Sequence, residues 1–168
     1  GVDGNAMKQQ QVITILGGGS FGTALANIAA ENGNKVYQWM RNREQAESMR
    51  IDRENRRYLP GCSLHPELHP VTEFSDAIKE SSLVLVAIPS SNFRQVVQQI
   101  KPYLTPDHSL LSTTKGIEAK TFKLMSEVLR EEAPDCQIGV ISGPNLAKEV
   151  ATRQLTATVV ASDNPGLC

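Results

Sequence analysis

A glycine-rich turn between an apolar stretch and an alanine-rich stretch constrains the fold more than any other feature of the sequence. Residues 12–30 read VITILGGGSFGTALANIAA, so that Gly17, Gly19 and Gly22 form the pattern G-x-G-x-x-G and Gly18 adds a fourth glycine. This pattern predicts dinucleotide binding where it follows a strand and opens a helix inside a strand–helix–strand unit. The first glycine then permits a tight turn, the second lets the pyrophosphate approach the backbone, and the third lets the helix pack on the strand.

Hydrophobic periodicity around the turn supplies this context. The sequence predicts a strand over 11–16, a helix over 23–32 that Gly33 ends, and a second strand over 35–40. At the start of such a helix, the backbone N–H groups from Ser20 and Phe21 onward attract a diphosphate, aided by the helix dipole. A turn tightened only for packing is the alternative, but it leaves Gly18 and Ser20 unexplained.

The rest of the chain alternates between short apolar runs and segments of helical period. We expect strands over 83–89, 109–114, 137–142 and 157–162, a loop over 58–71, and helices over 75–80 (with Ser75 as N-cap), 91–104, 121–132, 145–153 and part of 41–57. Continuous apolar strands separated by helices predict an α/β fold: a doubly wound (Rossmann), mostly parallel sheet with helices on both faces.

Residues 7–168 are interpreted as one dinucleotide-binding domain. Residues 1–6 precede Met7, a natural start, and are interpreted as a remnant of recombinant expression. Because the chain stops just after an expected strand, with no helix to cover it, we expect the whole protein to continue further.

Composition excludes several classes of function. The 168 residues carry a formal net charge of −1, which gives no electrostatic case for binding nucleic acid or an anionic membrane. The longest apolar runs, such as 83–88, are too short to cross a bilayer, and no secretory signal is visible. Three cysteines without a close pair predict neither a disulfide framework nor a zinc site, so a reducing cytoplasm is the expected location.

The histidines give no sign of a metal site. His65 and His69 are four residues apart, but Pro66 and Pro70 exclude a regular helix there, so the spacing loses its geometric meaning and no metal is expected. His108 lies in a predicted turn and is expected to face solvent.

The end of the second strand bears on the choice of cofactor. Arg41 stands where an NAD-selective site usually places an acidic residue that accepts from the ribose 2′-hydroxyl. A guanidinium there pairs with a 2′-phosphate, and Arg43 offers a second donor, so NADP(H) is favoured over NAD(H). Two solvated arginines at a helix start are the alternative.

Three further strand ends carry candidate residues. Pro89 ends the strand that should flank the crevice beside the first strand, and Phe93 either covers part of the cofactor or belongs to the helix core. Lys115 ends the next strand, where it either donates to a substrate or nicotinamide oxygen or is a solvated surface lysine. Gly143 and Pro144 open a helix whose first amides, near Asn145 and Ala147, form another anion-binding end. A phosphorylated substrate beside a nicotinamide fits this arrangement.

Several motifs, in order along the chain, resemble the N-terminal domain of the bacterial NAD(P)-dependent glycerol-3-phosphate dehydrogenase family. They are GGGSFGTALA (17–26), VYQWMRN (36–42), YLPG (58–61), VAIPS (86–90), STTKGIE (112–118) and SGPNLAKEV (142–150). The resemblance implies that Ser20, Phe21, Arg41, Lys115 and Ala147 contact the cofactor. It also implies that Lys115, Gly143 and Asn145 contact glycerol 3-phosphate, although the position of Asn145 is more often Ser or Thr in the family.

The resemblance further implies an oxidoreductase that interconverts sn-glycerol 3-phosphate and dihydroxyacetone phosphate for glycerophospholipid synthesis, with a homodimer as the full-length form. It assigns the general base to a lysine of a helical C-terminal domain that this chain does not contain. We therefore expect the chain to bind NAD(P)(H) but to turn over poorly. The alternatives are a related two-domain enzyme, such as a ketopantoate reductase or a hydroxyacid dehydrogenase, and a non-catalytic nucleotide-sensing module.

Overall fold

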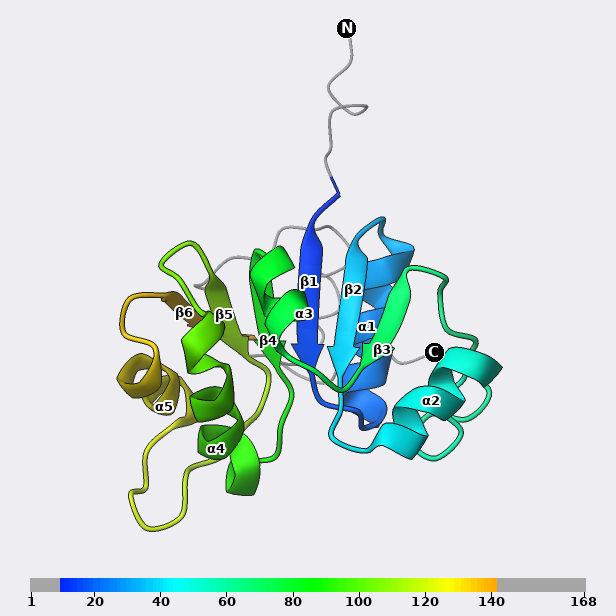
Figure 1. Ribbon diagram of the computed structural model, residues 1–168. Coiled ribbons are helices and arrows are strands. Elements are labelled where there is room, and N and C mark those ends of the chain that lie inside the picture. The colour runs from blue at the N-terminus through cyan, green and yellow to red at the C-terminus, as the bar shows by residue number, and fades with distance from the viewer. Residues whose placement is uncertain (1–9, 142–168) are drawn as a thin grey trace, which may run out of the picture.

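A computed structural model describes residues 10–141 and shows a six-stranded sheet with helices on both faces (Figure 1). The strand and helix expected over 157–162 and 145–153 lie outside the described residues. The strands are β1 Val12–Leu16, β2 Lys35–Trp39, β3 Leu68–Val71, β4 Leu83–Val86, β5 Ser109–Ser112 and β6 Gln137–Val140. The helices are α1 Ser20–Glu31, α2 Arg43–Asp52, α3 Ser75–Glu80, α4 Ser90–Ile100 and α5 Met125–Glu132, and a short 3-10 helix, η2 Lys101–Tyr103, follows α4.

The order of the strands creates a topological switch point beside β1. The sheet runs β3-β2-β1-β4-β5-β6, and all five neighbouring pairs are parallel. The chain therefore builds one half outward from β1 to β3 and then returns to the other side of β1 as β4. Ligands bind in such folds at the carboxyl ends of the strands near this reversal. The doubly wound parallel sheet predicted from the sequence is confirmed.

Two apolar layers cover the two faces of the sheet. On one face, α1 and α2 pack their buried residues, such as Leu25 and Met49, against Ile13 and Ile15 of β1. On the other face, α3, α4 and α5 pack residues such as Phe93 and Val128 against β4 and β5. The central strands are buried on both sides, because every residue of β4 is buried. This burial explains why β4 is a continuous apolar run in the sequence.

The segment 58–71, expected to be a loop, contains β3. Pro70 lies inside this strand, opposite Gln38 of β2. β3 pairs with β2 alone, so it is an edge strand, and one side of an edge strand tolerates the missing N–H of proline. The expectation failed because proline is a reliable breaker only for strands paired on both sides.

Three helix starts also differ from expectation. α1 begins at Ser20, three residues earlier than predicted, so the glycine turn leads directly into the helix. Phe74, and not Ser75, occupies the N-cap position of α3. α5 begins at Met125 because the preceding residues form a hairpin, in which Ile117 bridges Leu124 in the antiparallel sense.

Two side-chain environments correct the sequence analysis. His108 is buried, since its Nε2 lies 2.8 Å from the Ile78 carbonyl oxygen and its Nδ1 accepts from the Thr105 N–H at 2.9 Å. Cys62 is disulfide-bonded, whereas Cys136 is a free thiol. The expectation of unlinked cysteines rested on sequence spacing, which does not limit distances in space. Within residues 10–141, we find no helix with the length and apolar character needed to cross a membrane.

Candidate cofactor-binding site

The glycine turn connects β1 to α1 at the switch point, and three of its glycines are needed for steric reasons. Gly17 has a φ of 134°, and a Cβ there would lie 2.4 Å from the Ala87 carbonyl oxygen. A Cβ on Gly22 would lie 2.6 Å from the Gly17 carbonyl oxygen, so the third glycine lets α1 approach the turn. A Cβ on Gly18 would lie 2.8 Å from the Cβ of Met40.

Gly19 differs from the other three glycines. No described atom lies within 4 Å of the position that a Cβ on Gly19 would take. Its φ of −78° is open to any residue, so neither strain nor packing requires glycine here. The remaining physical reason for glycine is that something outside the described residues approaches the backbone at this point, which is the role that the sequence pattern assigns to it.

The N–H groups after Gly19 point to the chemistry of that approach. The first helical hydrogen bond of α1 runs from the Thr23 N–H to the Gly19 carbonyl at 3.0 Å, so the amides of Ser20, Phe21 and Gly22 precede the helical ladder. The first turn of α1 holds no acidic residue. Ser20 is exposed, and Phe21 packs partly against the core. A diphosphate fits this end of the helix, because unpaired amides and the positive end of the dipole both favour an anion.

The carbonyl groups of the turn are held by side-chain amides that the sequence analysis missed. The Gly18 carbonyl accepts from Gln45 Nε2 at 2.7 Å and from Asn55 Nδ2 at 2.9 Å, and the Gly17 carbonyl accepts from Gln38 Nε2 at 2.9 Å. The amides of Asn55 and Gln38 also donate to Thr23 Oγ1, at 2.8 and 2.9 Å. This network ties the carbonyls to the protein and fixes the turn in one conformation.

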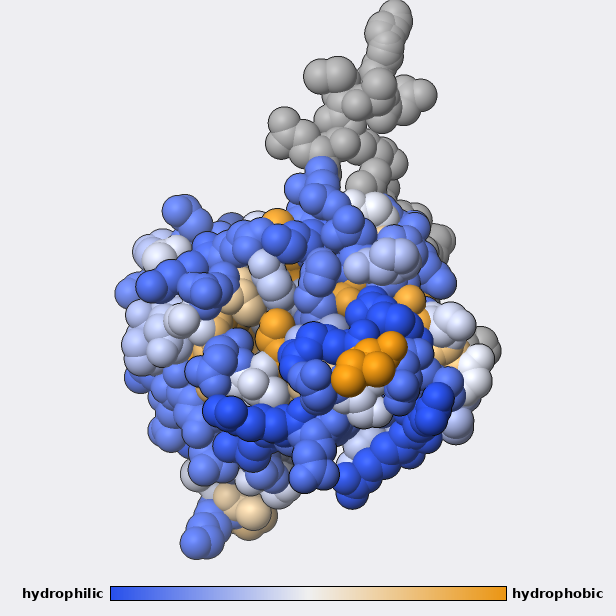
Figure 2. Space-filling model, turned by 45° about the vertical axis from the view of Figure 1, so that its right-hand side comes forward, coloured by the Kyte–Doolittle hydropathy of each residue, from blue (hydrophilic) through white to orange (hydrophobic). Residues whose placement is uncertain are grey.

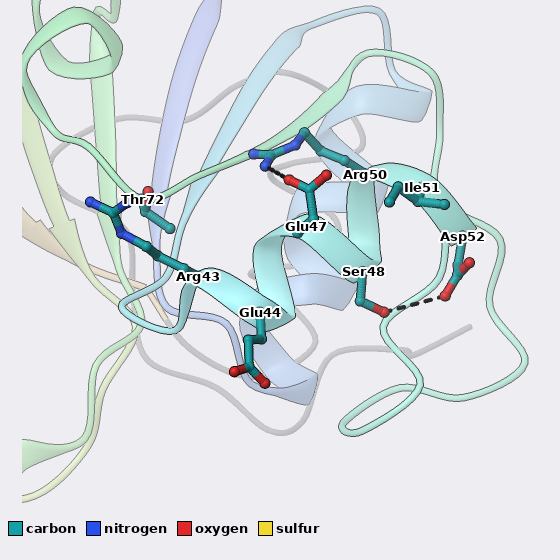
Figure 3. A pocket seen from close by; sticks show the side chains of 8 residues that line it. All are labelled: Arg43, Glu44, Glu47, Ser48, Arg50, Ile51, Asp52 and Thr72. Carbon is teal, nitrogen blue, oxygen red and sulfur yellow. Dashed lines mark hydrogen bonds and ion pairs between the residues drawn. The ribbon is translucent and has the colours of Figure 1, made fainter.

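Arg41 follows β2 and lies at the edge of the site, whereas Arg43, on α2, lies beside Glu73. Arg41 is exposed, and its Cζ lies 5.5 Å from the centroid of the Trp39 ring. The backbone carbonyl of Trp39 accepts from the Gly17 N–H at 2.8 Å, so Arg41 lies close to the glycine turn. Arg43 is exposed on α2, and its Nη2 lies 4.0 Å from Glu73 Oε2. Figure 3 shows Arg43 beside Thr72, at the start of α2.

The end of β4 lies beside the glycine turn. Pro89 is exposed and is the N-cap of α4, which begins at Ser90 and has no acidic residue in its first turn. Phe93 is fully buried among the residues of the α3–α5 face. A ring without exposed surface has none to offer a ligand, so the structure corrects the cofactor interpretation of Phe93 in favour of the core alternative.

Lys115 follows β5 at the same edge of the sheet. Thr114 Oγ1 donates to the Ile88 carbonyl at 2.7 Å, and Thr113 Oγ1 donates to the Val86 carbonyl at 3.2 Å. These bonds join the end of β5 to the end of β4, so Lys115 leaves the sheet next to the switch point and not at its amino edge. Lys115 is exposed and lines a cavity of about 240 Å³ with Gly116, Leu124 and neighbouring residues. The remaining candidates, Gly143, Asn145 and Ala147, lie outside the described residues.

A larger cavity lies elsewhere among the described residues, on the outer side of α2. Its volume is about 630 Å³, and Figure 3 shows charged side chains of both signs around it. Figure 2 shows this side of the molecule as largely hydrophilic with small apolar patches, and Ile51 of α2 is 70% exposed. Glu47 pairs with Arg50 within the same helix. The mixed charges are typical of a solvated helix face and not of a phosphate site.

A parallel sheet with a switch point beside a glycine turn defines the class of this protein: a dinucleotide-binding domain of the Rossmann type. Among residues 10–141, no cluster of three or more His, Cys, Asp or Glu side chains is arranged to hold a metal ion.

Comparison with known proteins gives the family. Residues 12–168 match the family described as NAD-dependent glycerol-3-phosphate dehydrogenase N-terminus, and the chain belongs to this family. It is 58% identical over 162 residues to a glycerol-3-phosphate dehydrogenase (NAD(P)+) of Pseudomonas aeruginosa and 56% identical to one of Pseudomonas fluorescens. Each alignment covers 96% of this chain and 47% of the relative, so the chain spans about half the length of these curated relatives.

Solved structures agree with this assignment. A glycerol-3-phosphate dehydrogenase from Coxiella burnetii is similar with a TM-score of 0.77 and 29% identity, covering 92% of this chain and 54% of that one. A ketopantoate reductase from Ralstonia eutropha reaches a TM-score of 0.63 at 17% identity, covering 90% of this chain and 56% of that one. At that identity the second likeness shows the fold alone.

Proposed function

We propose that this chain binds NAD(P)(H) at its glycine turn and forms the cofactor-binding half of an enzyme that interconverts sn-glycerol 3-phosphate and dihydroxyacetone phosphate. The observation that carries the proposal is the open space at Gly19, bordered by the amides that precede the α1 ladder. The names of the relatives support the substrate and the cofactor pair. When bound, the nicotinamide supplies hydride transfer to or from the carbon that carries the substrate hydroxyl.

The residues of this chain take separate roles in the proposal. The Ser20–Gly22 amides bind the diphosphate, and Arg41 pairs with a 2′-phosphate, which favours NADP(H) over NAD(H). Lys115 donates to the nicotinamide carboxamide or to the substrate oxygen, where an ammonium stabilises developing negative charge. Gly143 and Asn145 contribute to the substrate site, and Ala147 contributes to the cofactor site. The general base belongs to the further part of the enzyme.

The role of Arg41 is tested by titrating the chain with NADPH and with NADH. Trp39 is the single tryptophan and lies beside Arg41, so its emission reports binding through energy transfer to the reduced nicotinamide. In Arg41→Asp, NADPH affinity should fall by about tenfold or more, the equivalent of ~1.4 kcal/mol, whereas NADH should bind as well as before or better.

The charge reversal needs a matched control. Arg130→Asp on α5 makes the same change of net charge, and it should leave both affinities unchanged. If Arg41→Asp leaves the NADPH preference unchanged, Arg41 does not select the cofactor, although dinucleotide binding can still stand.

Activity is tested in a steady-state assay with glycerol 3-phosphate and NADP+. We expect binding of the cofactor with little or no turnover, because the family's general base lies outside this chain. Turnover at the rate of a full-length relative would contradict the proposal that this chain binds the cofactor but lacks the general base. From the likeness to the family, and not from the cysteines, we further propose a cytoplasmic location and supply of glycerophospholipid precursors. We also propose a homodimer in the full-length protein, which sedimentation of that protein would test.

A further inference from the structure

A hairpin formed by residues 116–124 directly follows Lys115. The Glu118 N–H donates to the Lys123 carbonyl at 2.8 Å, and the Phe122 N–H donates to the Glu118 carbonyl at 2.9 Å. Ile117 and Leu124 form an antiparallel bridge at its base. The conformation of this hairpin therefore determines the direction in which the chain leaves Lys115.

Apolar packing does not hold the hairpin in place. The side chains of Ile117, Phe122 and Leu124 are 48%, 73% and 53% exposed. Lys120 and Phe122 have φ values of 74° and 59°, a left-handed conformation that is unfavourable for residues other than glycine. Other interactions must hold a hairpin with little buried surface and two strained residues.

Arg94 of α4 supplies these interactions. Its Nε and Nη2 form a fork to the two carboxylate oxygens of Glu118, at 2.7 and 2.9 Å. Its Nη1 donates to Glu132 Oε2 at 2.7 Å, and its Nη2 lies 2.9 Å from Glu131 Oε1, both on α5. Thr121 Oγ1 donates to the same Glu118 carboxylate at 2.6 Å. Arg94 and Glu118 have only 24% and 17% of their side-chain surface exposed, so water screens this pair weakly.

Lys115 is thus held on both sides in the sequence. On one side, the hydroxyls of Thr113 and Thr114 attach the chain to the end of β4. On the other side, Glu118 attaches the chain to α4 three residues later. Between them lie Lys115, Gly116, whose φ is 106°, and Ile117.

We propose that Arg94 and Glu118 are positioning residues for Lys115, which their forked ion pair holds at the carboxyl edge of the sheet. The inference rests on the proposed function, in which Lys115 contacts the nicotinamide or the substrate. Lys101 and Lys123 lie beside Glu132 and Glu131, so the whole cluster of three cations and three carboxylates is electrically balanced. Removing the charge of Arg94 or of Glu118 upsets this balance and releases the hairpin.

The test measures the reactivity of Lys115 in the whole chain with pyridoxal 5′-phosphate. The unprotonated lysine amine condenses with the aldehyde and releases water, borohydride reduces the imine, and mass spectrometry of the Lys115 peptide gives the rate. In the parent chain, saturating NADPH should slow this modification by about tenfold or more, the equivalent of ~1.4 kcal/mol. In Arg94→Gln and Glu118→Gln, the protection should fall to about twofold, because each charge-assisted bond is lost.

Two more variants separate positioning from a merely structural role. Arg94→Lys keeps the charge but cannot form the fork, so it should show intermediate protection, and it replaces Arg94→Gln if that variant does not fold. Glu80→Gln removes a similar ion pair with Lys35, 2.8 Å long, at the amino edge of the sheet, and it should keep full protection. Folded Gln variants that retain the protection of the parent would overturn the inference.

The same experiment distinguishes failure of the proposed function from failure of the positioning inference. If NADPH quenches Trp39 in the parent chain but does not protect Lys115, dinucleotide binding stands and the positioning inference is overturned. If NADPH does not bind at all, the proposed function fails. The rate of Lys115 modification without ligand then tests the positioning inference. A released hairpin should change this rate in Arg94→Gln and Glu118→Gln but not in Glu80→Gln, and an unchanged rate in the Gln variants would overturn the inference.

Discussion

Gly19→Ala separates the cost of folding from the cost of binding. An alanine Cβ at Gly19 meets no described atom within 4 Å, and its φ of −78° is allowed for any residue. Alanine is a poorer N-cap than glycine by up to ~1 kcal/mol, but it also restricts the unfolded chain by ~0.4–1 kcal/mol. We therefore expect a melting temperature within about 4 °C of the parent.

Binding should respond much more strongly to the same methyl group. In the proposed function, the diphosphate approaches the amides of Ser20–Gly22 where this Cβ would lie, and displacing the anion from one amide forfeits a charge-assisted hydrogen bond of ~1.5–3 kcal/mol. This loss corresponds to a Kd for NADPH weakened roughly 10- to 150-fold. The assay is a titration of Trp39 emission with NADPH, together with a thermal melt of the same sample.

Gly33→Ala is the reciprocal control. Gly33 follows α1 with a φ of 94°, so alanine there is strained, and we expect a loss of stability of ~1 kcal/mol with an unchanged Kd. If Gly19→Ala bound NADPH as tightly as the parent, the diphosphate would not approach Gly19, and the glycine turn would not be the diphosphate site proposed above.

Three further outcomes follow from the structure. Gly22→Ala should lower the free energy of unfolding by ~1–3 kcal/mol in urea titrations, because its Cβ would lie 2.6 Å from a backbone oxygen of the turn; unchanged stability would show that α1 can shift away. Asn55→Ala should cost ~1–3 kcal/mol and weaken NADPH binding, because it removes one of two amide donors from the Gly18 carbonyl; an unaltered Kd would mean that the other donor suffices. The Arg94 guanidinium lowers the pKa of Glu118 to about 2 from an unfolded value of 4.5, so this group stabilises the fold above about pH 4.5 and loses that contribution as the pH falls toward 2. Glu118→Gln should flatten the acid limb of the stability curve, and an identical acid limb in the variant would contradict the ion pair.

Much of the fold was predictable because its signals are local. β1, the glycine turn and α1 follow one another without interruption, and Gly17, Gly18 and Gly22 each have a steric reason for lacking a side chain. The continuous apolar run of β4 indicated burial on both faces, which only a covered parallel sheet provides. The position of Lys115 followed from the same logic, since the carboxyl ends of parallel strands lie at one edge.

What could not be predicted depends on contacts between distant residues. Gln38, Gln45 and Asn55 are ordinary polar residues in the sequence, and only the fold brings their amides to the carbonyls of the glycine turn. The sequence allowed Phe93 either to cover part of the cofactor or to belong to the helix core, and only its complete burial in the structure decided for the core.

The hairpin before α5 could not be predicted from the sequence, for a different reason. Lys120 and Phe122 adopt left-handed conformations without being glycines, so the turn has no sequence signal. The segment from Thr121 has a helical composition, but Glu118 holds it to Arg94 from a distance of 24 positions. A long-range ion pair thus overrides the local preference for helix.

Amide NMR spectra of the chain with and without NADPH show whether the backbone at the start of α1 binds the cofactor diphosphate. The resonances of Gly19, Ser20, Phe21 and Gly22 should shift most, and inorganic pyrophosphate should shift the same amides more weakly. Shifts confined to the outer side of α2, around the larger cavity near Arg50, would contradict binding at the start of α1.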